Sequence, residues 1–101
     1  MNYQEMSDFE INAEVGALTG EAKNSEPMLN LVIRGNGRKF DPCNSWADAG
    51  PIIQENRISL FASDDEGKWM AQFINYKTVH MDKNPLRAAM IVFLMMKGGE
   101  L

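Results

Sequence analysis

The segment from Asp41 to Asp48 holds the side chains of this sequence best suited to contact another molecule. Asp41, Asn44 and Asp48 are short polar residues near an expected helix start, where they could line a ligand pocket. Trp46 lies among them and is of a type that often anchors interfaces. Polar loop residues held by rigid elements often form binding sites, yet capping and turn formation explain the same residue types. We take these four residues as the candidate binding surface.

Two single residues carry the reactive groups of the chain. Cys43, the only cysteine, precedes the same expected helix start, which could lower its pKa and activate it as a nucleophile. We favour a buried apolar cysteine, because no histidine is near it in sequence. His80, the only histidine, could be a general base or pH sensor, but a surface or capping role is favoured. One cysteine and one histidine do not make a zinc pattern, so no catalytic residue, metal or cofactor is predicted.

Two charged loops are weaker candidates. Arg34, Arg38 and Lys39 surround Gly35–Gly37 and could contact a phosphate, but the spacing is not that of a P-loop. We interpret this segment as an ordinary charged turn. Asp64–Glu66 lacks the ligand spacing of a calcium loop and is interpreted as a solvated hairpin turn.

Capping signals place the first and last helices. Ser7 and Glu10 have the spacing of a capping box, so a helix is predicted to start there and to stop at Gly20. Asn84 can cap a last helix over residues 86–97, which is apolar on every side. A helix without a solvated face is expected to form the centre of the core.

The helix expected near Ser45 is interrupted in the sequence by Gly50-Pro51. Proline inside a helix removes a hydrogen bond and clashes with the preceding turn. We therefore predict one turn over residues 45–49 and a kink or restart over residues 51–56.

Three apolar segments are predicted to be strands: residues 28–34, 58–63 and 68–74. The last two flank an Asp-Asp-Glu-Gly loop and give the clearest hairpin signal of the chain. Residues 38–40 could return as a further short strand. The polar stretches are interpreted as connections, with a variable linker or mobile loop over about residues 19–27 and another connection over residues 75–83.

These elements predict an α+β fold in the order α-β-α-β-β-α. Because strands and helices do not alternate, we expect a mostly antiparallel sheet of three or four strands, packed against the all-apolar C-terminal helix. The length of 101 residues suits one domain over residues 1–101. So few elements can hardly cover every side of the last helix, which favours a homodimer over a monomer.

The charge and hydropathy of the chain narrow the classes of partner that it can bind. The net charge is -4, and residues 1–26 hold six acidic side chains against one basic side chain, which opposes binding to nucleic acid. The most apolar stretch, residues 88–96, is nine residues long, whereas a bilayer span needs about 20. No membrane contact is predicted. The first residues show no secretory signal, so a cytoplasmic location is expected.

Two long blocks of the sequence resemble a known family. Residues 41–53 (Asp-Pro-Cys-Asn-Ser-Trp-Ala-Asp-Ala-Gly-Pro-Ile-Ile) and 84–95 (Asn-Pro-Leu-Arg-Ala-Ala-Met-Ile-Val-Phe-Leu-Met) are similar to the NinX family of small lambdoid-phage proteins. Residues 1–3 and 7–12 also resemble its opening, and only about residues 19–30 fall outside the likeness. The resemblance implies a phage or prophage accessory protein in the host cytoplasm. It carries no activity and therefore no catalytic residue.

Two classes of function fit the sequence. A non-enzymatic module that binds a phage or host protein is favoured, because no acid, base and nucleophile occur together and because Trp46 and Trp69 could anchor an interface. The alternative is a small enzyme or ligand-binding domain that uses a polar pocket around Asp41–Asp48.

Overall fold

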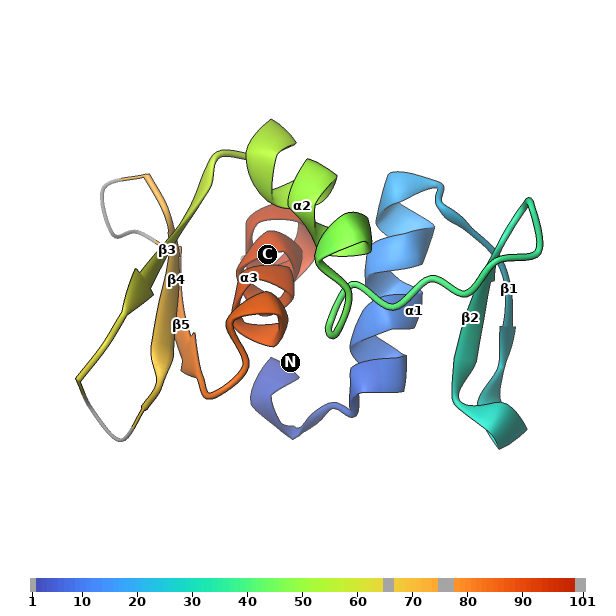
Figure 1. Ribbon diagram of the computed structural model, residues 1–101, viewed down its shortest axis with the longest axis horizontal. Helices are drawn as coiled ribbons and strands as arrows, with labels where there is room; N and C mark the ends of the chain where they lie inside the picture. Colours follow the sequence, from blue (N-terminus) through green and yellow to red (C-terminus); the bar gives the residue numbers. More distant parts are fainter. Residues whose placement is uncertain (1, 65–66, 75–77, 100–101) are drawn as a thin grey trace.

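Two separate antiparallel sheets flank the helices in the computed structural model (Figure 1). The structure describes residues 2–64, 67–74 and 78–99. The main elements are α1 (Asp8–Thr19), β1 (Ala22–Glu26), β2 (Leu31–Arg34), α2 (Trp46–Glu55), β3 (Ile58–Ala62), β4 (Trp69–Phe73), β5 (Thr78–Asp82) and α3 (Pro85–Leu94). Short turns of helix lie at Tyr3–Glu5, Pro27–Leu29 and Met95–Gly99.

The predicted fold class is confirmed. The chain is an α+β mixture in which strands β3, β4 and β5 form an antiparallel sheet, and α3 packs against one face of that sheet. The predicted hairpin is β3 and β4, in which Leu60 lies opposite Ala71. Ile58, Leu60 and Ala71 face α3 and join the core.

The chain holds two strands that the sequence did not predict. Residues 21–26, interpreted as part of a linker or mobile loop, contain β1, which pairs with β2 so that Glu26 lies opposite Leu31. Residues 78–82, interpreted as part of a polar connection, form β5, which pairs with β4. Residues 75–77 of that expected connection lie outside the described residues. In β1, whose residues are polar, pairing with β2 determines the extended backbone. In β5, Thr78 and Val79 favour a strand by themselves.

The second helix is continuous, whereas an interrupted helix was predicted. α2 runs without a break from Trp46 to Glu55 and includes Pro51, where a kink or restart was expected. Proline removes only one backbone hydrogen bond here, and its side chain lies on the exposed side of the helix. The burial of Ala49 and Ile52 on the other side stabilises the continuous helix.

Residues 38–40, which could return as a further short strand, form only one isolated β-bridge. Lys39 lies opposite Ile33, and the Phe40 N–H donates to the Val32 carbonyl at 2.8 Å. Pro42 has no N–H with which to extend the ladder. The segment therefore leads directly into the loop before α2.

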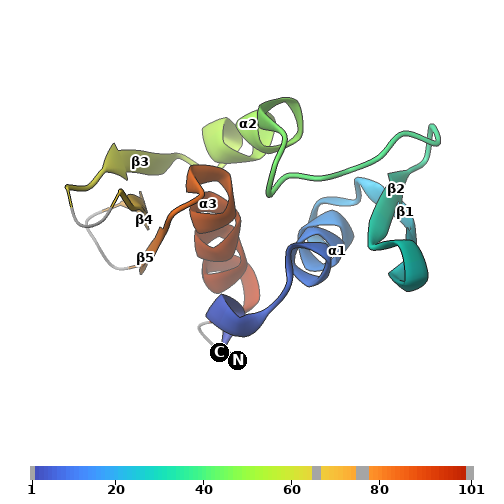
Figure 2. The ribbon, with the colours of Figure 1, turned by 60° about the horizontal axis from the view of Figure 1, so that its bottom comes forward.

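α3 is the centre of the core, as predicted. Leu86 and every residue from Ala88 to Leu94 are buried. The β3–β5 sheet lies on one side of α3, and α1 lies on the other (Figures 1 and 2). α2 also packs against α3, near the top of Figure 1. Because the chain itself covers α3, this helix offers no face to a second copy, and the reason for expecting a homodimer through it does not hold. None of the described helices is long and apolar enough to cross a membrane.

The packing of α1 on β1 depends on Gly16. A Cβ atom there would lie 2.5 Å from the Cβ of Ala22, so Gly16→Ala is expected to lower the free energy of unfolding by about 1–3 kcal/mol, although alanine favours helix. Gly35, in the turn after β2, is the matched control, because a Cβ there meets nothing within 4 Å. Gly35→Ala should change stability by less than about 0.5 kcal/mol. Urea denaturation checks both changes, and a stabilising Gly16→Ala would contradict the close contact.

Candidate functional site

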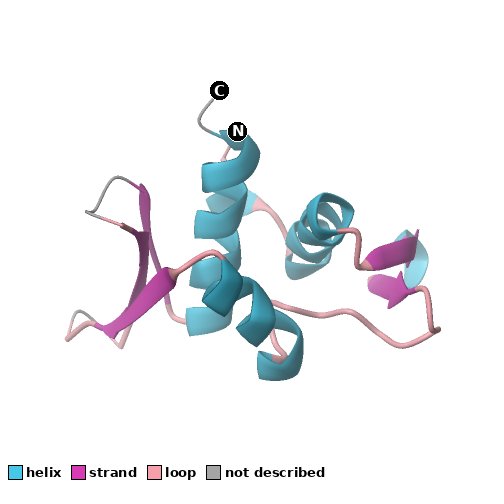
Figure 3. Ribbon diagram, turned by 90° about the horizontal axis from the view of Figure 1, so that it is seen from above, coloured by secondary structure: helices cyan, strands magenta, loops and turns pink. Residues whose placement is uncertain are grey.

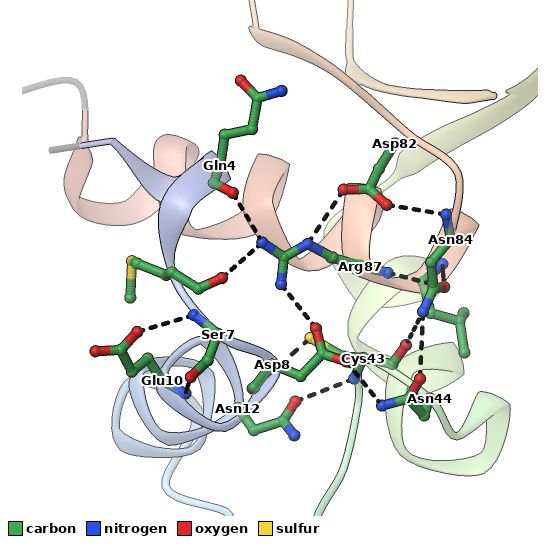
Figure 4. A network of polar contacts seen from close by, with 12 residues as sticks. Gln4, Ser7, Asp8, Glu10, Asn12, Cys43, Asn44, Asp82, Asn84 and Arg87 are labelled. Carbon is green, nitrogen blue, oxygen red and sulfur yellow. Dashed lines mark hydrogen bonds and ion pairs between the residues drawn. The ribbon is translucent and has the colours of Figure 1, made fainter. Parts of the chain in front are cut away.

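The first turns of α1 and α3 meet the loop before α2, and polar side chains fill this junction (Figure 4). Both helix starts are capped as predicted. Ser7 Oγ accepts from the Glu10 N–H at 3.1 Å, and the Glu10 carboxylate accepts from the Ser7 N–H at 2.8 Å. Asn84 Oδ1 accepts from the N–H of Leu86 at 2.9 Å, while Asn84 Nδ2 donates to the carbonyl of Cys43 at 2.7 Å. The Asn84 side chain, which caps α3, therefore also fixes the loop before α2.

Arg87, the single basic residue of α3, holds the junction together. Its Nη1 donates to the Asp8 carboxylate at 2.7 Å, and its Nε donates to the Asp82 carboxylate at 3.1 Å. Its Nη2 donates to the carbonyls of Met6 at 2.6 Å and Gln4 at 3.1 Å. The side chain is only 14% exposed. One guanidinium thus links α3 to the end of β5, to α1 and to the segment that precedes α1.

The structure brings Asp41 and Asn44 together with two residues of α1. Asp41 Oδ1 accepts from Asn12 Nδ2 at 2.8 Å and from Asn44 Nδ2 at 3.1 Å. Asn44 Nδ2 also lies 3.1 Å from the carboxylate of Asp8. Asn12 is 5% exposed, and its Oδ1 accepts from the N–H of Cys43 at 3.0 Å. These bonds connect the loop to α1 and, through Asp8, to Arg87.

Asp48 faces β2 instead. Its Oδ1 accepts from Arg34 Nη2 at 2.7 Å, and its Oδ2 accepts from the N–H of Asp41 at 2.8 Å. The hydrogen bond from Arg34 to Asp48 raises the pKa of Arg34. Arg34 also pairs with Glu21 and lies 4.7 Å from the centre of the Phe40 ring. With its guanidinium engaged in this way, Arg34 belongs to the fold and not to a phosphate site.

Trp46 is exposed, although the loop around it is held firmly. It is the first residue of α2, and 60% of it is accessible to solvent. Cys43 and Ala49 on either side are fully buried. Ser45 caps the helix by accepting from the Asp48 N–H at 3.3 Å. The indole is therefore attached to a backbone held in place on both sides, and it lies mostly outside the core.

A cleft of about 330 Å³ lies beside the network, between α1, the start of β2 and residues 39–44. Asp41 and Asn44 line it, whereas Trp46 and Asp48 do not. Lys39 Nζ lies 3.8 Å from Asp41 Oδ2 at the same cleft. The four predicted residues thus belong to one segment but do not face one pocket.

Cys43 and His80 have surroundings different from those that would activate them. Burial raises the pKa of the Cys43 thiol, and the nearby Asp8 carboxylate raises it further, so the thiolate is disfavoured. His80, expected at the surface or as a cap, lies in β5 with its Nε2 buried and without a hydrogen-bond partner. Burial lowers the pKa of His80, Asp82 raises it and Arg87 lowers it.

The remaining loop candidates are plain turns as far as the structure describes them. Gly37 has a φ of 85°, and its N–H donates to the Arg34 carbonyl at 2.9 Å, which closes the predicted charged turn. The predicted acidic turn at Asp64–Glu66 falls partly on residues 65–66, which lie outside the described residues. Within residues 2–64, 67–74 and 78–99, no group of three or more His, Cys, Asp or Glu side chains is placed to hold a metal ion.

Sequence reasoning missed the residues that organise the site. Asp8, Asn12 and Arg87 are far from Asp41 and Asn44 in the chain, so local patterns do not connect them. Arg87 did carry a signal, because it is a lone cation in an apolar helix. A charge in such a position needs partners from other elements, since buried charges are paired.

Replacing Arg87 tests its role as the link. Arg87→Lys is expected to lower the free energy of unfolding by about 2–4 kcal/mol, because one ammonium group cannot serve acceptors on opposite sides of a planar guanidinium. Arg38→Lys, on the exposed turn, is the matched control and should change stability by less than about 0.5 kcal/mol. Equal denaturation midpoints for the two variants would show that the Arg87 bonds contribute little.

The half-buried imidazole of His80 predicts a pH dependence of stability. Because folding lowers its pKa, the unfolded chain binds a proton more readily than the folded chain as pH falls below about 6.5. Stability should therefore decrease from pH 7.5 to pH 5.5 more steeply in the wild type than in His80→Gln. As the chain has one histidine, no other imidazole contributes. Urea denaturation at both pH values checks this, and parallel slopes would refute it.

Comparison with known proteins agrees with the likeness carried by the two sequence blocks. No curated protein matches the chain. The family model described as Bacteriophage P22, NinX matches residues 2–97. That match covers the polar junction and every helix and strand described above except the end of the helical turn at Met95–Gly99. The chain therefore belongs to the NinX family of bacteriophage proteins.

Proposed function

We propose that this phage accessory protein is a non-enzymatic module that binds a phage or host protein in the host cytoplasm. Its contact surface consists of Trp46 with Asp41, Asn44 and Asp48, and we call it the 41–48 surface. The observation that carries the proposal is the exposure of Trp46, which is 60% accessible on a segment whose backbone is fixed on both sides.

A fixed backbone makes an exposed tryptophan a good anchor. Asp48 accepts from the backbone of Asp41, and Asn84 donates to the backbone of Cys43, so the loop does not need to be ordered when a partner binds. Binding then costs less conformational entropy than docking on a flexible loop. A large aromatic ring that contributes little to the core, held on such a support, is typical of an interface residue.

The polar residues of the 41–48 surface give the partner its orientation. The side chains of Asp41 and Asp48 are 19% and 15% exposed, so they act mostly by fixing the backbone beside Trp46. Asn44 is exposed and can contact the partner directly. The remaining accessible carboxylate edges favour a partner that presents hydrogen-bond donors. The net charge of -4 disfavours a phosphate backbone as that partner.

The cleft lined by Asp41 and Asn44 supports a second candidate, a small enzyme or ligand-binding domain. Its volume of about 330 Å³ suits a small polar ligand. However, the carboxylates of Asp8 and Asp41 in the cleft already accept hydrogen bonds from the chain itself. A ligand would therefore have to displace bonds that hold the loop to α1. This cost makes the interaction module the better supported function.

The exposed indole is tested with a tagged protein in infected cells. Trp46→Ala should weaken capture of a stoichiometric protein partner by about 1–2 kcal/mol or more, while the melting temperature stays nearly constant because the ring lies mostly outside the core. Trp69→Ala, at a position 37% exposed on β4, is the matched control and should keep full binding.

Two results would contradict this prediction. A loss of stability of about 3–5 kcal/mol in Trp46→Ala would place the ring in the core. A wild-type protein that captures no partner but purifies with a bound metabolite would favour the ligand-binding alternative.

A further inference from the structure

The β3–β5 sheet has a second face that α3 does not cover. Along each strand alternate residues point away from α3, and we call this set the outer sheet face: Ser59, Phe61, Met70, Gln72, Val79 and Met81. None of the four apolar residues in this set packs against the core. Figures 1 and 3 show α3 on one side of the sheet and no described helix or strand on the other.

The register brings the apolar side chains of this face together. Met70 in the central strand lies opposite Phe61 on β3 and opposite Met81 on β5. Phe61 is 46% exposed. Methionine side chains adapt their shape to whatever packs on them, so this row forms a pliable apolar surface.

Gln72 lies in the middle of the same face. It pairs with Ser59 on one side and with Val79 on the other. Only 6% of the residue is exposed, and its Oε1 is buried without a hydrogen-bond partner. A buried amide oxygen without a donor is rare in folded proteins, and this one can gain a donor from outside the chain only if the Gln72 side chain turns outward.

Charge indicates which molecule that group belongs to. All six residues of the outer sheet face are neutral, whereas the chain as a whole carries -4. A second copy that docks on this face therefore brings no like charges of these six positions together, whereas residues 1–26 hold six acidic side chains against one basic side chain. A strongly charged partner would find no complementary charge there.

The amide of Gln72 makes the face complementary to itself. A primary amide carries both a donor and an acceptor, so two amides related by a two-fold axis satisfy each other. A two-fold axis also places the same apolar patch on both sides of the interface. Rotation of the Gln72 side chain toward that axis would pair its orphaned Oε1.

We propose that two copies of this chain associate through the outer sheet face, with Gln72 and the partner's Gln72 hydrogen-bonded to each other on the two-fold axis. The two sheets pack face to face at a separation of about 10 Å. Three strands of five residues offer less area than a standard stable interface, so the dimer is weak and forms only at high protein concentration. This assembly does not use the 41–48 surface and is independent of the function proposed for it.

Sedimentation velocity from about 10 μM to 1 mM tests the proposal. The wild type should shift with concentration from 11.4 kDa toward twice that mass. Phe61→Lys places a charge on the outer sheet face and should weaken the dimer roughly tenfold or more. Leu18→Lys adds the same charge at a position on α1 that is 50% exposed, and it should dimerise as the wild type does. A wild type that stays monomeric at 1 mM, or equal behaviour of the two variants, overturns the proposal.

Gln72→Glu tests the proposed hydrogen bond between the two Gln72 side chains on the two-fold axis. At neutral pH two carboxylates would meet on the axis and prevent association, whereas below the carboxyl pKa the protonated groups can pair again. Circular dichroism of the dilute variant establishes that the monomer folds. Dimerisation of a folded Gln72→Glu at neutral pH to the same extent as the wild type would refute the amide pair. If the variant does not fold, the comparison of Phe61→Lys with Leu18→Lys decides alone.

Discussion

The arrangement of this protein depends on the guanidinium of Arg87. It binds the Asp8 and Asp82 carboxylates and the carbonyls of Gln4 and Met6, groups that lie on different elements. A planar group with five N–H donors can serve acceptors in several directions at once, which an ammonium group cannot do. Because Asp8 also binds Asn44, the position of the 41–48 surface follows from the same interaction.

A buried network of this kind imposes one geometry on the fold. Arg87, Asp82 and Asn12 are largely removed from water, so each needs its partners in place to offset the loss of hydration. Any other placement of α1 against α3 would leave charged or amide groups unpaired. The apolar packing of α3 supplies most of the burial, while the polar junction determines where the N-terminal segment and the loop before α2 lie.

Local patterns in the sequence predict what local contacts decide. The caps at Ser7 and Asn84 and the hairpin of β3 and β4 need only neighbouring residues, and all were predicted. β1 could not be, because its polar residues become a strand only beside β2. β5 was missed for another reason, since Thr78 and Val79 favour strands but residues 75–83 were interpreted as a polar connection. The clustering of Asp41 and Asn44 was predicted, but their bonds to Asn12 and Asp8 depend on how distant elements pack.

The exposed faces of this protein are determined by the way its elements cover α3. α3 is buried all round, so each element that covers it has one face bound and another in water. Most of these outer faces are charged or polar, as on α1, where Glu10 and Glu14 are exposed. Several large apolar side chains nevertheless remain accessible, among them Trp46, Phe61 on the outer sheet face, Met28 and Leu29 before β2, and Leu18 on α1. Trp46 lies on α2 and not on the outer sheet face, so a dimer formed through that face leaves Trp46 accessible to a different partner.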